Sequence, residues 1–232
     1  MRRHLLWTAS ALTASVLVLA GCGDAGSSGT EAPASSAAGA GCAPVAGETL
    51  VVLTDDKKLQ NTDNIVPAIN KKAASPQLIA ALDKVSAALD TTKLIELNKA
   101  VDIDRKSSKA AAQEFATANN LTAGIEKGPG GDLTVGAANF SENATLGELY
   151  AIALTAAGYQ VKVQQIGNRE LYEPALEKGD LDVVPEYAAT LATFLNGKVN
   201  GESAEDPSSP ELETTMKNLT ALGEKSNLVF GK

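Results

Sequence analysis

Histidine and cysteine, from which many catalytic and metal sites are built, are nearly absent from this chain of 232 residues. The only histidine, His4, lies close to the N-terminus, and there are 2 cysteines. The sequence contains no P-loop, no serine-nucleophile motif and no Cys/His cluster with metal-ligand spacing. We therefore expect a protein that is not an enzyme and that holds no metal or other cofactor.

Positive charge and aromatic residues are also scarce. The chain has 20 Lys and Arg against 28 Asp and Glu, which gives a formal charge of −8. This balance argues against nucleic acid as a partner, because nothing in the chain neutralises a row of phosphates. Aromatic residues make up 4% of the chain and hydrophobic residues 44%. The hydrophobic content suffices for one domain with a real core or for two small lobes.

The N-terminus carries the most specific signal. Arg2 and Arg3 precede an apolar run and small residues that end at Cys22. This pattern predicts an export signal over residues 1–21, too short and wrongly flanked for a stable membrane span. Its end, "LAGC", resembles a bacterial lipobox, in which the peptide is cut before the cysteine and lipid is attached there. Several acyl chains anchor firmly, since each buried methylene adds about 0.8 kcal/mol. The alternative is a plain secretory signal with a coincidental cysteine.

Residues 22–47 are rich in Gly, Ala and Ser and read as a flexible tether. A lipid, a tether and a folded body together predict a protein held on the outer face of a membrane. Cys42 then has no partner in this chain, so it is either buried and inert or paired elsewhere.

Two kinds of pattern follow the tether. Residues 49–123 predict extended segments and then three helices, the first entered through Ser75 and Pro76. Residues 124–131 form a Gly/Pro linker. From there strands and helices alternate, which predicts an α/β fold with a mostly parallel sheet and flanking helices. The expected strands are 49–53, 64–69, 133–138, 159–166 and 180–187, and the expected helices are 75–90, 91–102, 107–120, 141–158, 168–179 and 188–197.

The final part of the chain, residues 200–232, is polar, with one weak helical stretch. It ends just after "NLVF", which reads as the start of another strand. In sheets of this kind, ligands bind beyond the carboxyl ends of the strands. Those ends are residues 138–142, 167–170 and 185–187.

Two motifs in the alternating region carry a family resemblance. "NFSEN" follows the first strand of this region, and "GDLDVVPEY" contains the last. They resemble the substrate-binding proteins of osmoprotectant ABC importers, which take up glycine betaine, choline and carnitine. The family's usual form is close to "PEYTGT", whereas this chain has "PEYAAT". The resemblance covers about residues 132–199. It implies a type II periplasmic-binding-protein-like lobe that works outside the cytoplasm with the membrane subunits of an importer.

The segment 48–123 resembles the opposite end of the same family, its C-terminal stretch, so the order is permuted. In the two-lobed family this stretch packs on the first lobe. Residues 48–123 and 132–199 are therefore expected to form one lobe. Residues 200–232 would cross toward a second lobe, largely missing and expected after Lys232. A fragment with one lobe is expected to have little or no osmolyte affinity by itself. A non-transporting surface lipoprotein and a nonfunctional truncated copy are the alternatives.

A quaternary ammonium group has no N–H to donate, so aromatic ring faces are its suitable partners. Tyr187 in "VPEY" matches the family's cage tyrosine; the alternative is a core aromatic at a strand end. The remaining tyrosines, Tyr150, Tyr159 and Tyr172, are expected to have packing roles.

Two strand-to-helix turns and one earlier residue complete the expected site. Asn139, Phe140, Ser141 and Glu142 begin a helix whose free N–H groups suit a ligand carboxylate. Capping of that helix by Asn139 and Glu142 is an alternative that is compatible with binding.

The second turn holds Arg169 and Glu170. A glutamate near the cage would favour a cation without a carboxylate, such as choline, whereas Arg169 would instead hold the carboxylate of betaine. A solvated surface pair of Arg169 and Glu170, with no role in binding, is an equally open alternative. Asn64 belongs to the Asn-rich turn that the resemblance places opposite this site.

Overall fold

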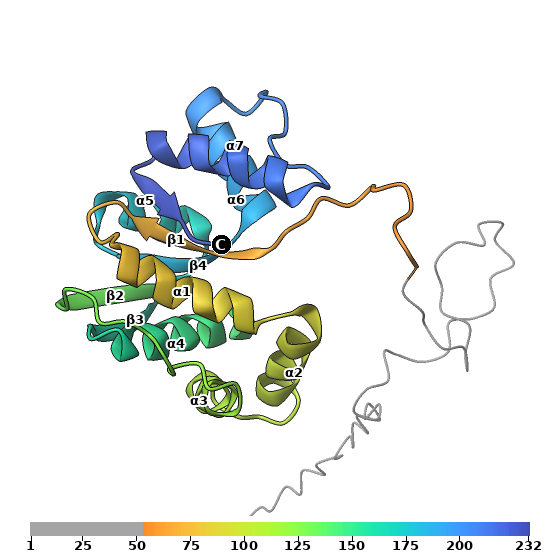
Figure 1. Cartoon of the computed structure of the whole chain (residues 1–232). Helices are drawn as coiled ribbons and strands as arrows, with labels where there is room; N and C mark the ends of the chain where they lie inside the picture. The colour runs from red at the N-terminus through yellow and green to blue at the C-terminus, as the bar shows by residue number, and fades with distance from the viewer. Residues whose placement is uncertain (1–52) are drawn as a thin grey trace, which may run out of the picture. The chain divides into compact units, whose positions relative to one another are not determined.

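A computed structural model describes residues 53–232 of the chain (Figure 1). The predicted export signal, the lipidation site Cys22, the tether and Cys42 lie outside the described residues, as do residues 49–52 of the first predicted strand. In the part that is described, no helix is both long enough and apolar enough to span a membrane.

The described residues form seven helices and five strands. All the helices and strands expected between residues 64 and 197 are present, with bounds that differ by a few residues, and the weak helical stretch and final strand also form. The strands are β1 (Ile65–Asn70), β2 (Asp132–Ala137), β3 (Gln160–Gln165), β4 (Val183–Tyr187) and β5 (Leu228–Phe230). The helices are α1 (Pro76–Ala88), α2 (Thr91–Asp102), α3 (Ser108–Ala118), α4 (Ser141–Ala156), α5 (Arg169–Lys178), α6 (Ala188–Asn200) and α7 (Leu212–Lys225).

The strands form one sheet in the order β3-β2-β4-β1-β5. Strands β2, β3 and β4 run parallel, as expected from the strand–helix alternation. Strand β1 runs antiparallel to both of its neighbours, β4 and β5, so four strands share one direction and the sheet is mixed. The earlier segment of the chain thus contributes a central strand to the same sheet as the later segment, and residues 200–232 add β5 to its edge.

Helices cover both faces of this sheet (Figure 1). Helices α1 and α4 pack on one face, with α3 packed against the outside of α4, and α5, α6 and α7 lie on the other face. Adjacent residues of β4 show the alternation that a strand between two layers requires, because Val183 faces the first cluster and Val184 the second. Both side chains are buried, and each such burial stabilises the fold by about 1.5–3 kcal/mol.

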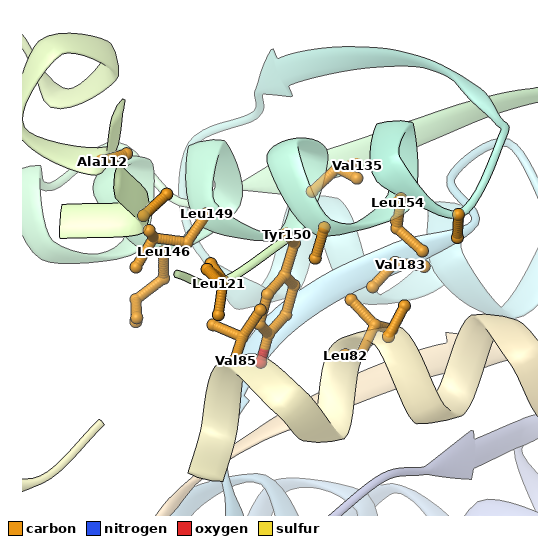
Figure 2. Packing of buried hydrophobic residues seen from close by; sticks show 14 of the residues in the cluster. Leu82, Val85, Ala112, Leu121, Val135, Leu146, Leu149, Tyr150, Leu154 and Val183 are labelled. Atoms are coloured by element: carbon orange, nitrogen blue, oxygen red, sulfur yellow. The ribbon is translucent and has the colours of Figure 1, made fainter. Parts of the chain in front are cut away.

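Tyr150 lies at the centre of the first cluster (Figure 2). Its ring extends from α4 toward α1, close to Leu82 and Val85, and it is 0% exposed. Its hydroxyl has no hydrogen-bond partner among the described residues. Burial, followed by the charges of Asp83 and Glu186, raises the pKa of Tyr150, so the phenol stays neutral. Tyr150 therefore has the packing role expected from its helical position.

Local signals explain where several helices begin and end. The hydroxyl of Ser75 accepts the N–H of Leu78 at 3.1 Å, and Pro76 is the first residue of α1. Helix α4 ends just before Gly158, which has a φ of 97° and is the last residue of the expected helix 141–158. Helix α5 ends at Gly179 with a φ of 87°, a conformation that glycine adopts without a steric penalty.

Candidate functional site

Tyr187 and Glu142 meet where β4 and β2 end and α4 begins. Tyr187 is the last residue of β4, and its hydroxyl donates a hydrogen bond of 2.5 Å to Oε1 of Glu142 in the first turn of α4. The amide of Asn98, on α2, donates to the other carboxylate oxygen of Glu142. Two neutral donors thus hold the Glu142 carboxylate in place. The contact also joins the two halves of the sequence, since Asn98 belongs to the earlier segment.

Phe140 adds a second ring to this edge. Its ring stacks on that of Tyr187 with centroids 6.3 Å apart and an interplanar angle of 28°. Phe140 is 46% exposed although it is a large apolar side chain, so the pair presents aromatic surface to solvent. Burial, reinforced by the hydrogen bond to Glu142, raises the pKa of Tyr187 and keeps its ring uncharged.

The first turn of α4 has no side-chain cap. Phe140 is the N-cap residue, and within residues 53–232 no side chain caps the free N–H groups there. The capping that the sequence suggested for Asn139 and Glu142 is therefore wrong, because Glu142 turns to Tyr187 and Asn98 instead. Asn139 is exposed, and its backbone N–H donates to the carbonyl of Gly167 at 3.1 Å, which ties the two predicted turns together. Ser141 is half-buried at the start of the helix.

Arg169 pairs with a residue that the sequence analysis did not select. Its Nε and Nη2 donate to the two carboxylate oxygens of Glu186 at 2.9 and 2.7 Å. Glu186 is 1% exposed and also accepts the hydroxyl of Tyr172 at 2.8 Å. Arg169 therefore does not form the solvated pair with Glu170 that the sequence allowed. It pairs with the buried Glu186 instead, and Glu170 is exposed. Burial opposes the charge of Arg169, but the hydrogen bonds and charge of Glu186 outweigh it and raise the pKa of the guanidinium.

The Asn-rich turn reaches the same edge of the sheet. Asn64 is exposed, and its carbonyl accepts the N–H of Ala188 at 2.9 Å. Oδ1 of Asp63 accepts the N–H groups of Ala189 and Thr190 at 2.8 and 3.3 Å, so it caps the N-terminus of α6. The structure therefore brings this turn against the residues that directly follow Tyr187.

A pocket of about 250 Å³ lies beside Tyr187. Its walls come from the turn before β1, the end of α1 and the start of α2, and they include Asp63, Asn64, Ile65, Ser86, Leu94 and Tyr187. Two of the predicted site residues, Asn64 and Tyr187, thus share one pocket. Arg169 and Glu186 lie apart from it, since Glu186 points to the opposite face of the sheet from Tyr187.

Three residues of this region were not found from the sequence: Glu186, Asp63 and Asn98. A signal for Glu186 existed, because a carboxylate within the buried run "VVPEY" requires a charged or hydrogen-bonding partner. Asp63 and Asn98 gave no such signal. Their partners lie more than forty positions along the chain, and only the fold brings them together.

The comparison with protein families decides the assignment. The family model described as the substrate binding domain of an ABC-type glycine betaine transport system matches residues 44–118 and 131–221. The match covers more than half of the chain. This chain belongs to that family. The comparison with curated proteins found no match.

Membership gives the general role. The family consists of substrate-binding proteins and not of enzymes, so the chain is a binding protein of a glycine betaine-type ABC transporter. Substrate-binding proteins of ABC importers work outside the cytoplasm together with membrane subunits. Its fold agrees with this assignment, because a mixed five-stranded sheet flanked by helices is a periplasmic-binding-protein-like α/β lobe. In residues 53–232, no three His, Cys, Asp or Glu side chains are grouped so as to hold a metal ion.

Proposed function

We propose that this chain binds quaternary ammonium osmoprotectants, such as glycine betaine, choline or carnitine, with Tyr187 as part of an aromatic cage. The position of Tyr187 is the observation that carries this proposal. Its ring lies at the carboxyl edge of the parallel strands, stacks on Phe140 and lines a pocket. Ligands bind at this edge in open α/β sheets.

The chemistry of the ring fits the ligand. A trimethylammonium group spreads its charge over methyl groups, and the negative face of an aromatic ring attracts it by about 0.5–2 kcal/mol. The bond from Tyr187 to Glu142 holds the ring in place, so little conformational entropy is lost on binding. Glu142 adds a negative charge next to the ring, which also favours a cation.

The start of α4 is the second proposed element of the site. Its first turn has no side-chain cap, so its N–H groups are free to donate to a ligand oxygen. Asn139, Phe140 and Ser141 lie at this turn, and Asn64 lines the same pocket as Tyr187. Glu170 and Arg169 border the neighbouring turn, where the bond from Asn139 to Gly167 holds the two turns together.

We also propose that the chain has the permuted organisation indicated by its sequence. Residues 48–123 would correspond to the C-terminal segment of the family and residues 132–199 to its first lobe. Two observations support this reading. The family match falls into two blocks separated by residues 119–130, and β1 enters the sheet antiparallel, between β4 and β5.

Attachment to the membrane is part of the same proposal. The "LAGC" sequence supports lipidation of Cys22, followed by a tether over residues 22–47. The lipid would hold the binding domain near the membrane subunits of its importer. Metabolic labelling with a radioactive or alkyne fatty acid tests this, because Cys22→Ala is expected to abolish the label and Cys42→Ala to leave it unchanged.

Ligand binding to the purified full-length chain tests the function. Titrations with choline and glycine betaine to high concentration, followed by NMR or calorimetry, are expected to show saturable but weak binding, because one lobe supplies only part of the cage. Tyr187→Ala is expected to weaken it by about 3- to 30-fold, the free energy of one ring. Tyr187→Phe keeps the ring face and is expected to lose less.

Tyr159→Phe is the matched control for the two Tyr187 variants. It removes a tyrosine hydroxyl that bonds to Ser75 at 2.9 Å, away from the proposed site, and is expected to leave binding unchanged. Equal binding by the wild type and Tyr187→Ala would contradict the cage. The absence of saturable binding by either compound would contradict the function.

A further inference from the structure

We propose that Glu142 makes this site selective for quaternary ammonium compounds that carry no carboxylate, and against zwitterions such as glycine betaine. The inference rests on the proposed function and names the ligand class within it. Three observations support it. The Glu142 carboxylate has no cationic partner among the described residues, Arg169 is already paired with Glu186, and the carboxylate of Asp63 caps the N-terminus of α6.

The Glu142 carboxylate is fixed but not balanced by a cation. Both its oxygens accept hydrogen bonds, from the Tyr187 hydroxyl and from the Asn98 amide, and both donors are neutral. No Lys or Arg forms an ion pair with Glu142 in the part of the chain that the structure describes. A full negative charge therefore stands beside the aromatic ring proposed to receive the ammonium group.

Arg169 does not offset this charge. The sequence allowed it to hold the carboxylate of betaine, but its guanidinium makes a two-pronged pair with the buried Glu186 and also donates to Thr190 at 3.0 Å. Binding a ligand carboxylate there would require breaking that pair and leaving Glu186 buried without its cation. The positive charge at this edge is thus already satisfied within the protein.

The two helix starts at this edge also have a carboxylate of their own. Asp63 accepts the first N–H groups of α6, and Glu142 lies within the first turn of α4. The positive end of each helix dipole therefore already interacts with a carboxylate of the protein. A ligand carboxylate that approached either helix N-terminus would be repelled by that negative charge. A neutral acceptor, such as the hydroxyl oxygen of choline, can still use the uncapped N–H groups of α4 without that repulsion.

The test compares three probes on the full-length chain: choline chloride, glycine betaine and 3,3-dimethyl-1-butanol, the uncharged analogue of choline. The wild type is expected to bind choline at least about tenfold more tightly than betaine, the scale of one like-charge contact near a protein surface. The uncharged analogue is expected to bind more weakly than choline, because it lacks the cation.

Glu142→Gln is the decisive variant. It keeps an acceptor for Tyr187 and similar volume but removes the charge, so the ratio of choline to betaine affinity is expected to fall to within about threefold of unity as the like-charge contact disappears. Glu96→Gln removes an exposed carboxylate from α2, two residues from Asn98, and is expected to leave the ratio unchanged.

Each outcome has a separate meaning. A wild type that binds both compounds equally, or prefers betaine, overturns the inference and leaves the proposed function intact. The same holds if a folded Glu142→Gln variant keeps the wild-type ratio. If neither choline nor betaine binds, the proposed function fails, and the inference fails with it. The wild-type ratio decides the matter even if the variant does not fold.

Discussion

The guanidinium of Arg169 and the carboxylate of Glu186 form a two-pronged ion pair at the junction of α5 and β4. Glu186 is almost fully buried, and Tyr172 donates a third hydrogen bond to it. A charge taken out of water to this extent is stable only if it is paired and hydrogen-bonded. The pair therefore fixes the end of β4, one residue before Tyr187.

Removal of the Arg169 guanidinium is expected to destabilise the fold. Arg169→Met leaves the buried Glu186 carboxylate unpaired and should lower the free energy of unfolding by about 3–5 kcal/mol, measured by urea denaturation. The double variant Arg169→Met/Glu186→Met removes both charges and should be less destabilised than the single one. Lys162→Met, at an exposed position of β3, is the control and should change stability by less than about 0.5 kcal/mol. A single variant as stable as the control would contradict the buried-pair argument.

The cap that Asp63 provides to α6 gives a second prediction. Asp63→Ala removes the acceptor for the N–H groups of Ala189 and Thr190 and should cost about 0.5–2 kcal/mol of stability. Hydrogen exchange of these two amides should become faster, while amides at the centre of α6 change little. Asp56→Ala, a nearby exposed position, should leave both measurements unchanged. Unchanged exchange at Ala189 in the Asp63 variant would show that the cap is not formed in solution.

Sequence patterns predicted the local structure of this chain well. Helix α1 begins after Ser75 as expected, α2 covers the expected residues 91–102, and α4 and α5 end next to residues 158 and 179, where the expected helices end. These features depend on neighbouring residues, so the information lies within a few positions of the sequence.

Long-range relationships were predicted less well. The parallel direction of β2, β3 and β4 followed from strand–helix alternation, but the antiparallel entry of β1 did not, because nothing in "NIVPAI" encodes its direction. Tyr187 was placed correctly at a strand end, whereas Asn139 and Glu142 do not cap α4. The choice between a cap and a tertiary contact depended on Tyr187, which lies 45 positions from Glu142.

Two glycines are expected to respond to alanine in opposite directions. A Cβ at Gly136 in β2 would lie 2.7 Å from Cδ1 of Leu181 and 2.9 Å from Cγ2 of Val184, so Gly136→Ala should cost about 1–3 kcal/mol through overpacking. A Cβ at Gly197 in α6 meets nothing within 4 Å, and alanine there should stabilise the protein by about 0.5–1 kcal/mol. Thermal unfolding of the two variants provides the measurement. A rise in Tm for Gly136→Ala would show that Leu181 and Val184 pack less closely against β2 than described.

A buried carboxylate between α5 and α6 predicts a pH dependence of stability. Glu173 is 1% exposed, and Oε2 accepts a hydrogen bond of 2.8 Å from Nζ of Lys198, which also pairs with Glu177. Its other oxygen has no partner among the described residues. Burial, helped by the neighbouring Glu177 and opposed by Lys198, raises the pKa of Glu173 to about 7.

The sign of the effect follows from this shift. Because the folded state holds the Glu173 proton more tightly than the unfolded state, its contribution to stability is fully present below the unfolded pKa and is lost as the pH rises toward 7. The lowered pKa of Glu177 acts at more acidic pH, outside this window. Between pH 5 and pH 8, the wild type should therefore lose about 2 kcal/mol of unfolding free energy relative to Glu173→Gln, which cannot titrate.

Urea denaturation of both proteins at pH 5, 6, 7 and 8 measures this difference. Glu114→Gln, which removes an exposed carboxylate from α3, is the control and should follow the wild type at every pH. If the wild-type and Glu173→Gln curves stay parallel across this range, the Glu173 carboxylate is not desolvated in solution, and the packing of α5 against α6 around Lys198 is looser than the structure shows.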